Sequence, residues 1–521
     1  MASATSTLME AYCFPFFISL ISLLIVRWLI KRFTKSEANL VFPPTPPALP
    51  IIGHNYLLSS KLPQSLQTLA RRYGPLMQIR IGSSTFVVVS NAAVAKEIFI
   101  THDLDFASRY EPCPGEYNIY SGSGFMTGPY GQYWLFMKKL CVTKLFAQPQ
   151  IDRFNRIREQ EIVKILKSLM KRSREGEPCN LGTELAYMTN NVIFRMIISK
   201  RLSENNDESK YMRKLAVEMT ELAAKLGVSK VFSFLTKMDL FGNGKKLKEV
   251  FRRYNEFAEQ IMKEYEENGI INGGENEDRD LMDILLETFR DRDAEVKLTR
   301  NQIKYFVLEL FFASVDGIST TIQWAIAELV NRPDVFNKLR KEIDSVVGLT
   351  RLVKESDVPK LPFLQAVLKE TMRLHPLGAI IHRECVRDCK INGFDVKART
   401  KALINAYAIM RDPEEWENPD EFLPDRFLIK FNGNNDEHHE QMQMEGQDFG
   451  YIPFGGGSRA CVGSTHANLV MRTTIGALVQ CFDWKIKGGE DVGINVGSGS
   501  FPGKMELPLI AYPITRFDPL N

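Results

Sequence analysis

The chain has 521 residues, of which 44% are hydrophobic, enough to fill one large core, and no change in composition divides it. Its formal net charge of +3 is close to neutral, so nothing indicates binding to nucleic acid. The eight cysteines show neither C-x-x-C pairs nor zinc spacing, which in so long a chain favours a reducing cytosol over a disulfide framework.

The N-terminal segment has the pattern of a membrane anchor. The apolar stretch 11–30 is close to the roughly 20 residues that a helix needs to cross a bilayer. No Lys or Arg precedes it, whereas Lys31, Arg32 and Lys35 follow, so the positive-inside rule places residues 1–10 in the lumen and the remainder in the cytosol. A cleaved signal peptide fits less well, because it has basic residues before its apolar core. Residues 31–50, basic and then proline-rich, predict a stiff hinge.

The remaining chain, 51–521, is predicted to form a single domain that is mainly α-helical with a smaller β region. Helical periodicity dominates from 131 to 345, and mixed strands and helices follow. The other predicted elements are a β-hairpin over 77–82 and 85–90, a helix over 92–101, a mobile loop over 105–130 and a polar insert over 432–447.

The first candidate site residues occur at the start of the helical region, in Tyr133-Trp-Leu-Phe-Met-Lys138-Lys139. Trp134 and Lys138 are one helical turn apart and therefore share a face. Together they could bind an anionic group such as a haem propionate.

A long apolar helix is predicted from about 301 to 331. Its centre reads Ala313-Ser314-Val315-Asp316-Gly317, followed by Ile318. A carboxylate in such surroundings is either a paired core residue or a group that relays protons. Gly317 weakens the helix locally by about 1 kcal/mol relative to alanine, which is consistent with a kink.

Two further segments together suggest a structural clamp. Glu370 and Arg373 are three residues apart in an apolar helical frame that ends before Pro376. Arg426, in Pro-Asp-Arg-Phe, could join this pair, with Asp425 beside it. Most exposed pairs of this kind contribute under about 1 kcal/mol, but a buried, bidentate pair would fix two segments.

The segment Phe454-Gly-Gly-Gly-Ser-Arg-Ala-Cys461-Val-Gly463 places one cysteine after a glycine-rich loop and before an amphipathic helical stretch. Glycines let the backbone approach a flat ligand closely and adopt positive φ. The loop N–H groups and the positive end of the helix are expected to lower the pKa of the thiol. Such a thiolate can bind haem iron, whereas the alternative is an ordinary buried cysteine.

Four of these motifs are Trp-x-x-x-Lys, Glu-x-x-Arg, Pro-Asp-Arg-Phe and the glycine–cysteine loop. In this order and spacing they resemble the motifs of the cytochrome P-450 superfamily, and the resemblance covers essentially the whole chain. The cysteine segment matches F-x-x-G-x-R-x-C-x-G at every fixed position. The resemblance implies the P-450 fold, with haem b between the long helix and the cysteine loop and Cys461 as the axial iron ligand. It also implies O₂ as substrate. The residues expected to bind the cofactor are Trp134, Lys138, Arg459, Phe454, Gly457 and Gly463.

The long helix departs from the family pattern, which usually shows Ala-Gly-x-Asp/Glu-Thr. Asp316 is retained, but Gly317 replaces the threonine and Ser314 replaces the glycine. We therefore expect Asp316 to relay protons. Water held over Gly317, with Ser314 or the substrate's own oxygen, is expected to replace the lost hydroxyl.

The chain has no Rossmann fingerprint and no flavin-binding region, so electrons from NADPH must come through a separate protein. The resemblance suggests NADPH–cytochrome P-450 reductase at the endoplasmic reticulum membrane.

The segments 136–143 and 324–329 are similar to those of plant microsomal A-type members that modify flavonoids and triterpenoids. The expected substrate is a pentacyclic triterpenoid, friedelin- or amyrin-like, oxidised at a methyl group and, by repetition, through alcohol and aldehyde to acid. An apolar pocket suits such a ligand. A flavonoid hydroxylase or synthase, a reductase-independent haem-thiolate isomerase or dehydratase, and a haem- or sterol-binding protein without turnover remain alternatives. The expected pocket residues are Phe125, Phe312, Ala313, Ile380 and Ile381.

Overall fold

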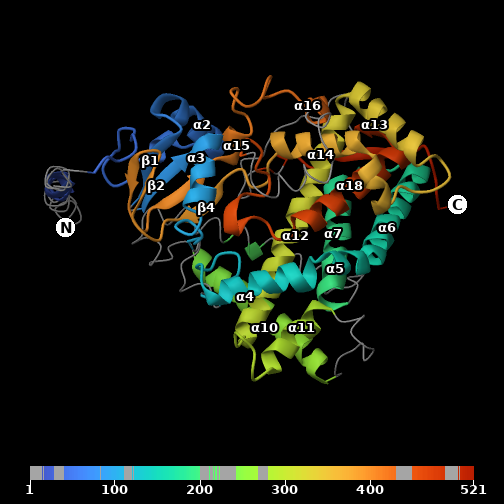
Figure 1. The fold of residues 1–521 in the computed structure, drawn as a ribbon, viewed down its shortest axis with the longest axis horizontal. Coiled ribbons are helices and arrows are strands. Elements are labelled where there is room, and N and C mark those ends of the chain that lie inside the picture. Colours follow the sequence, from blue (N-terminus) through green and yellow to red (C-terminus); the bar gives the residue numbers. More distant parts are fainter. Residues whose placement is uncertain are drawn as a thin grey trace, which may run out of the picture.

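The computed structural model describes residues 17–28, 40–82, 84–110, 122–199, 242–267, 280–429, 449–486 and 505–520, with a few isolated residues between them. It confirms a mainly helical fold with a smaller β region (Figure 1). Its α-helices are α2 Leu62–Tyr73, α3 Ala92–Lys96, α4 Gln132–Leu140, α5 Gln148–Arg153, α6 Asn155–Glu175, α7 Leu181–Ile198, α10 Asn243–Glu267, α11 Leu281–Arg290, α12 Arg300–Val330, α13 Pro333–Val346, α14 Pro362–Leu374, α15 Ala406–Ile409, α16 Asp425–Ile429 and α18 Ser464–Cys481. Shorter helical turns are η1 Asn55–Leu57, η2 Glu97–Thr101, η3 Cys141–Leu145, η4 Glu355–Lys360 and η5 Gly457–Arg459.

The strands form three small sheets in the described part of the chain. They are β1 Leu76–Ile81, β2 Ser84–Val89, β3 Cys179–Asn180, β4 Ile381–Glu384, β5 Cys389–Ile391, β6 Phe394–Val396, β7 Lys401–Ile404, β8 Phe482–Ile486 and β9 Ile510–Thr515. The sheet orders are β1-β2-β7-β4, β3-β9-β8 and β5-β6. The predicted hairpin is confirmed as β1 and β2, which pair antiparallel from Leu76↔Val89 to Ile81↔Ser84. β2 then pairs in parallel with β7, so the N-terminal hairpin adjoins a segment from the last third of the chain.

The central element is α12, which crosses the middle of the helical part in Figure 1 and confirms the predicted long helix. It begins at a capping box, because the Thr299 side chain accepts from the Gln302 N–H and the Gln302 side chain accepts from the Thr299 N–H. The half of α12 up to Phe311 belongs to one hydrophobic cluster, and the half from Ile318 belongs to another. The stretch 313–317 therefore lies between the two parts of the core.

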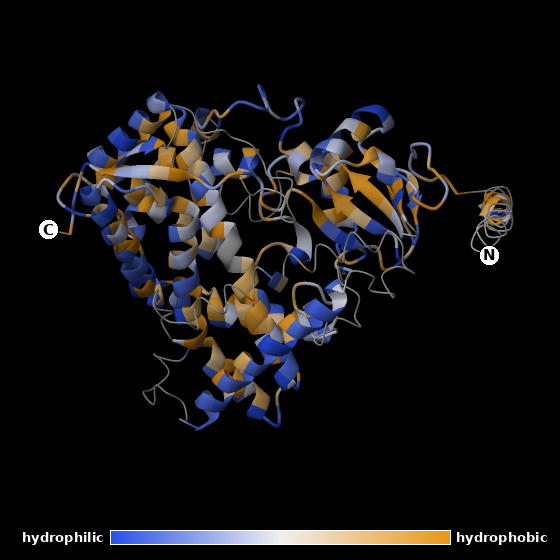
Figure 2. Ribbon diagram, turned by 180° about the vertical axis from the view of Figure 1, so that it is seen from behind, coloured by the Kyte–Doolittle hydropathy of each residue, from blue (hydrophilic) through white to orange (hydrophobic). Residues whose placement is uncertain are grey.

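Hydrophobic residues follow the strands of the larger sheet, whereas hydrophilic residues cover the outer helices (Figure 2). The α-helix Phe17–Trp28 carries exposed apolar side chains, with Phe17 at 58% and Leu23 at 64%, but is shorter than a membrane span. Within the described residues, α12 alone is long and apolar enough to cross a membrane, and most of it is buried in the core. Residues 1–10 and the insert 432–447 lie outside the described residues, as do parts of 11–50 and of 105–130.

Candidate active site

The cysteine loop is held by its own backbone and by Asp103. The Cys461 N–H donates to the Phe454 carbonyl at 3.0 Å, and the Ala460 N–H donates to the Gly457 carbonyl at 2.9 Å. Gly457 has φ +67°, and a Cβ there would lie 2.2 Å from Asp103 Oδ1. The Ser458 N–H donates to the same oxygen at 2.8 Å. A glycine is therefore required at position 457 because a side chain there would collide with Asp103. This reason adds to the close approach to a ligand that the sequence suggested.

Cys461 borders an internal space, because its surface is accessible although protein surrounds it closely enough to desolvate the thiol. Burial raises the pKa of Cys461, while the Gly463 N–H and the charge of Arg109 act to lower it. The expected lowering of this pKa by the loop and helix is thus wrong for the protein chain by itself, since desolvation outweighs both favourable contacts. A coordinated metal ion deprotonates a thiol outright, so a raised pKa does not oppose iron binding. The following helix is confirmed as α18, but from Val470 onward it is buried on all sides and is not amphipathic.

Three guanidinium groups, those of the half-buried Arg109 and the buried Arg383 and Arg459, gather around this loop. Burial and the mutual repulsion of these cations lower the pKa of Arg383 well below its usual range, and they lower the pKa of Arg459 to about 9. Burial also lowers the pKa of Arg109, which the charges of Cys461 and Glu309 partly restore. All three side chains donate hydrogen bonds to main-chain carbonyls. Arg109 donates to Met126 at 3.0 Å, and Arg383 donates to His382 at 2.9 Å and to Gly456 at 3.3 Å. Arg459 donates to the carbonyls of Ala107, Phe125 and Gly128 at 2.6, 3.2 and 2.7 Å.

A backbone bridge brings two of these arginines together. The Glu384 N–H donates to the Ser108 carbonyl at 2.9 Å, which joins the end of β4 to the segment before Arg109. The sequence analysis missed Arg109 and Arg383. One signal could have identified Arg383: it is a basic residue at an inward-facing position of the short strand β4.

The three arginines and the thiol fit haem. None of the three guanidinium groups meets a carboxylate within 4 Å in the described part of the chain, and Arg109 Nε has no hydrogen-bond acceptor there. Buried charges are normally paired, so this cluster calls for an anionic ligand. Haem would supply two propionates to pair with the arginines and an iron to bind the thiol of Cys461.

Trp134 and Lys138 support this cluster from α4. The Trp134 ring is stacked on Phe125 with centroids 6.0 Å apart, and the Arg459 guanidinium lies 4.2 Å from its centroid. Lys138 Nζ donates to the Ser458 carbonyl at 2.7 Å, in addition to lying 5.3 Å from the same ring. Both residues therefore lie beside the cysteine loop, and in this arrangement they position Arg459 and Ser458.

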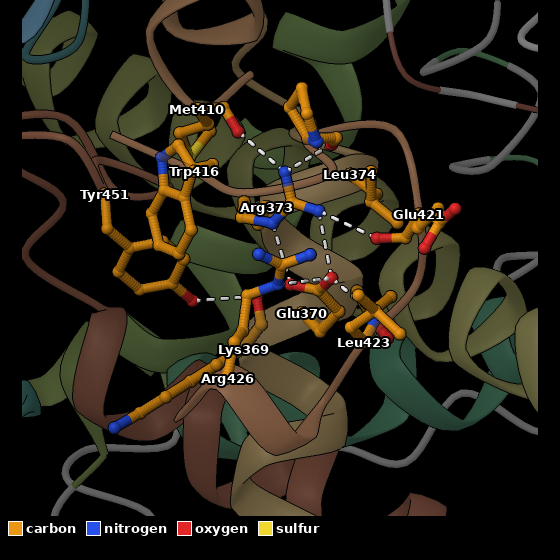
Figure 3. A network of polar contacts seen from close by, with 12 residues as sticks. Lys369, Glu370, Arg373, Leu374, Met410, Trp416, Glu421, Leu423, Arg426 and Tyr451 are labelled. Atoms are coloured by element: carbon orange, nitrogen blue, oxygen red, sulfur yellow. Dashed lines mark hydrogen bonds and ion pairs between the residues drawn. The ribbon is translucent and has the colours of Figure 1, made fainter. Parts of the chain in front are cut away.

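Glu370 and Arg373, both fully buried, meet the partly buried Arg426 in one network (Figure 3). Arg373 donates from Nε and Nη2 to the two carboxylate oxygens of Glu370 at 2.7 and 2.9 Å. It also donates to the carbonyls of Met410, Pro419 and Glu421 at 2.9, 2.6 and 3.1 Å. Glu370 accepts in addition from the Leu423 N–H at 2.8 Å and from Arg426 Nε at 3.1 Å. Asp425 pairs instead with Lys338.

The network reaches the cysteine loop through Trp416. The Arg373 guanidinium lies 5.2 Å from the centroid of the Trp416 ring, and Trp416 Nε1 donates to the Gly450 carbonyl at 3.1 Å. Tyr451 then donates from its hydroxyl to the Lys369 carbonyl at 3.1 Å. The clamp thus fixes the segment that enters the loop at Phe454.

On α12, Ala313 is exposed although it lies at the middle of a largely buried helix. Among the described residues, a Cβ on Gly317 would meet only Leu377 Cδ2, at 3.4 Å, so space is available beside this turn as well. The Gly317 carbonyl accepts from the Thr321 hydroxyl at 2.9 Å, a contact that often bends helices, although α12 is helical throughout. The side chains of Ser314 and Asp316 lie outside the described residues.

The predicted pocket residues divide into two groups. Phe312 and Ile381 are half-buried, and Ala313 is exposed. Phe125 and Ile380 are buried, Phe125 against Trp134 and Phe306 and Ile380 in the hydrophobic cluster of the larger sheet. Their assignment to the pocket lining stays a prediction.

Sequence analysis also missed Glu309, one turn before Ala313. Its carboxylate accepts from the N–H groups of Phe125 at 2.6 Å and Met126 at 3.1 Å. Burial raises its pKa to about 7 despite these hydrogen bonds and the nearby charge of Arg109. Glu309 thus ties α12 to the segment whose carbonyls bind Arg109 and Arg459.

Comparisons with known proteins agree with this geometry. The cytochrome P-450 family model matches residues 43–501. Cytochrome P-450 705A12 of Arabidopsis thaliana is 41% identical, with 94% of each chain covered. Beta-amyrin 24-hydroxylase of Glycine max is 39% identical over 98% of this chain and 99% of its own. The 3,9-dihydroxypterocarpan 6A-monooxygenase of Glycine max is 38% identical over 96% and 98%.

A solved zebrafish cytochrome P-450 with progesterone has a TM-score of 0.73 at 24% identity, covering 87% of this chain and 99% of its own, which supports the fold. The chain therefore belongs to the cytochrome P-450 family, as a plant-type monooxygenase that uses haem with a cysteine thiolate ligand, O₂ and electrons drawn from NADPH.

Proposed function

We propose that this enzyme oxidises a methyl group of a pentacyclic triterpenoid, friedelin- or amyrin-like, with repeated turnover carrying the methyl through alcohol and aldehyde to acid. The observation that supports this proposal is the exposure of Ala313, a small apolar residue at the middle of α12 between the two hydrophobic clusters. A hydrocarbon ring system can lie against such a residue without leaving a buried polar group unpaired. The relative named as a beta-amyrin hydroxylase supports this substrate class.

In this proposal Cys461 binds the iron, while Arg109, Arg383 and Arg459 hold the propionates. Trp134, Lys138, Phe454, Gly457 and Gly463 shape the cradle. Haem, when bound, activates O₂ for insertion into a C–H bond. Asp316 relays protons to the oxygen site, and Gly317 leaves room for the water that replaces a threonine hydroxyl. Ser314 or the substrate's own oxygen is the further hydrogen-bonding group.

The proposed organisation places residues 1–10 in the lumen of the endoplasmic reticulum, 11–30 across the membrane, 31–50 as a hinge and 51–521 in the cytosol. The exposed apolar side chains of Phe17–Trp28 support a membrane contact there. NADPH–cytochrome P-450 reductase on the same membrane would supply electrons.

A flavonoid-type substrate is the second candidate, because the pterocarpan monooxygenase is 38% identical, against 39% for the beta-amyrin hydroxylase. Yeast microsomes that carry this enzyme and a plant reductase would separate the two. They would be given β-amyrin, friedelin, a flavanone and a pterocarpan separately, with and without NADPH. Cys461→Ser serves as the control.

We expect NADPH-dependent oxidation of a triterpenoid methyl group and no product from Cys461→Ser. Products from the flavanone or pterocarpan alone would replace the proposed substrate class with the second candidate. Product formation without NADPH would indicate a haem-thiolate isomerase or dehydratase. The reduced, carbon monoxide-bound protein should show the red-shifted Soret band of a thiolate-ligated haem, and its absence from folded, haem-loaded protein would exclude Cys461 as the ligand.

A further inference from the structure

We propose that His102, Asp105, Cys389 and Cys385 form a zinc site beside the cysteine loop, with no residue in common with the haem site. The ligand atoms of His102, Asp105 and Cys389 all lie within 4.8 Å of one another. Cys385 Sγ lies 3.7 Å from Cys389 Sγ. No pattern in the sequence indicated this group, because the first two residues and the two cysteines come from distant segments.

Two of the separations between donor atoms can be compared with those of a tetrahedral zinc site. Zn–S bonds of about 2.3 Å in a tetrahedral site place two sulfur atoms about 3.8 Å apart, close to the observed 3.7 Å. His102 Nδ1 and Asp105 Oδ2 are 2.9 Å apart, and a separation of about 3.3 Å would suit a tetrahedral site. Side-chain rotations that bring the remaining donor atoms to such separations would complete the site.

The backbone holds the two halves of the site together. The Val386 N–H donates to the Asp105 carbonyl at 2.9 Å, next to the bridge between Ser108 and Glu384. Cys389 begins β5 and pairs with Val396 of β6. The ligands are thus carried by hydrogen-bonded segments, so little ordering is needed when a metal ion binds.

The chemistry of these donors selects the metal. Two thiols, an imidazole and a carboxylate form a set that suits Zn²⁺, whereas Mg²⁺ and Ca²⁺ prefer oxygen ligands alone. The His102 side chain is 20% exposed, which leaves a path for entry.

Arg387 is the competing partner, since it forms an ion pair with Asp105. Its side chain is 73% exposed, so it can move into solvent when a cation replaces it. Asp103, which follows His102 in the chain, accepts a hydrogen bond from the Ser458 N–H of the cysteine loop. A zinc ion here would therefore brace the segment on which that loop rests.

Zinc content of the full-length, haem-loaded protein tests the proposal. The protein would carry a tag without histidine clusters, be made in zinc-supplemented medium, and be dialysed in reducing buffer without chelator. Elemental analysis should find about one zinc per chain in the wild type. His102→Gln and Cys389→Ser should lose it, whereas Arg387→Gln and Cys179→Ser, the latter at a buried cysteine in β3, should keep it.

Because a cysteine variant can fail to fold, alkylation of the wild type gives a second measurement. Added zinc sulfate should protect Cys389 from iodoacetamide, and zinc should leave when a mercurial reagent titrates the thiols. Equal zinc in the wild type and His102→Gln would overturn the proposal. A Cys385–Cys389 disulfide in protein kept under reducing conditions would overturn it too. The haem spectrum of the same samples distinguishes loss of zinc from failure of the haem site.

Discussion

Glu370→Gln would test the clamp most directly, since glutamine keeps the volume of the side chain but removes its charge. Glu370 and Arg373 are both 0% exposed, and Glu370 accepts four hydrogen bonds. The substitution leaves the Arg373 guanidinium buried without a counter-charge, and the new amide N–H₂ faces N–H donors.

The expected cost is about 3–5 kcal/mol, the range for removing one partner of a buried ion pair. This is a large fraction of the roughly 5–15 kcal/mol that stabilises a typical folded domain. Arg373 also fixes the carbonyls of Met410, Pro419 and Glu421 and contacts Trp416, so the segment entering the cysteine loop should loosen. Haem retention should therefore fall together with stability.

The matched control is Glu355→Gln. Arg158 donates to both oxygens of Glu355 at 2.5 and 2.7 Å, and the two side chains are 0% and 8% exposed, but this pair joins α6 to η4. Urea unfolding should show similar losses for both variants, whereas haem bound per chain should fall further in Glu370→Gln. Equal haem retention in the two variants, or a loss of stability below about 1 kcal/mol in Glu370→Gln, would refute the reasoning.

Three further predictions concern the haem site and α12. Arg109→Gln should speed haem transfer to apomyoglobin about 10- to 100-fold, because one charge-assisted hydrogen bond is lost, while Arg252→Gln on the exposed face of α10 should leave the rate unchanged. An unchanged rate in Arg109→Gln would argue against its propionate role. Burial raises the pKa of Glu309 from 4.5 to about 7. Between pH 4.5 and about 7 the Glu309 carboxyl is therefore protonated in the folded, haem-free chain and ionised in the unfolded chain. The free energy of unfolding should thus fall by about 3 kcal/mol as pH rises through this window, and urea unfolding of Glu309→Gln should show a smaller fall; an identical slope would contradict this assignment. Gly317→Thr has room beside Leu377 and should keep or improve the ratio of product to NADPH consumed. Loss of turnover with haem intact would show that the glycine serves another purpose.

Sequence alone determined what depends on local spacing. The hairpin, the long apolar helix and the Glu370–Arg373 pair were predictable because a period of two or 3.6 residues decides which side chains share a face. The four motifs likewise identified the family, since each lies within a short segment.

Only the tertiary structure decided how distant segments combine. The pairing of 105–108 with 384–386 places Arg109 beside Arg383, and it also places His102 and Asp105 beside Cys389. Burial then raises the pKa of Cys461 against the local tendency of its loop. The physical reason is that desolvation and charge repulsion depend on every group packed around an atom, and the chain order does not specify that neighbourhood.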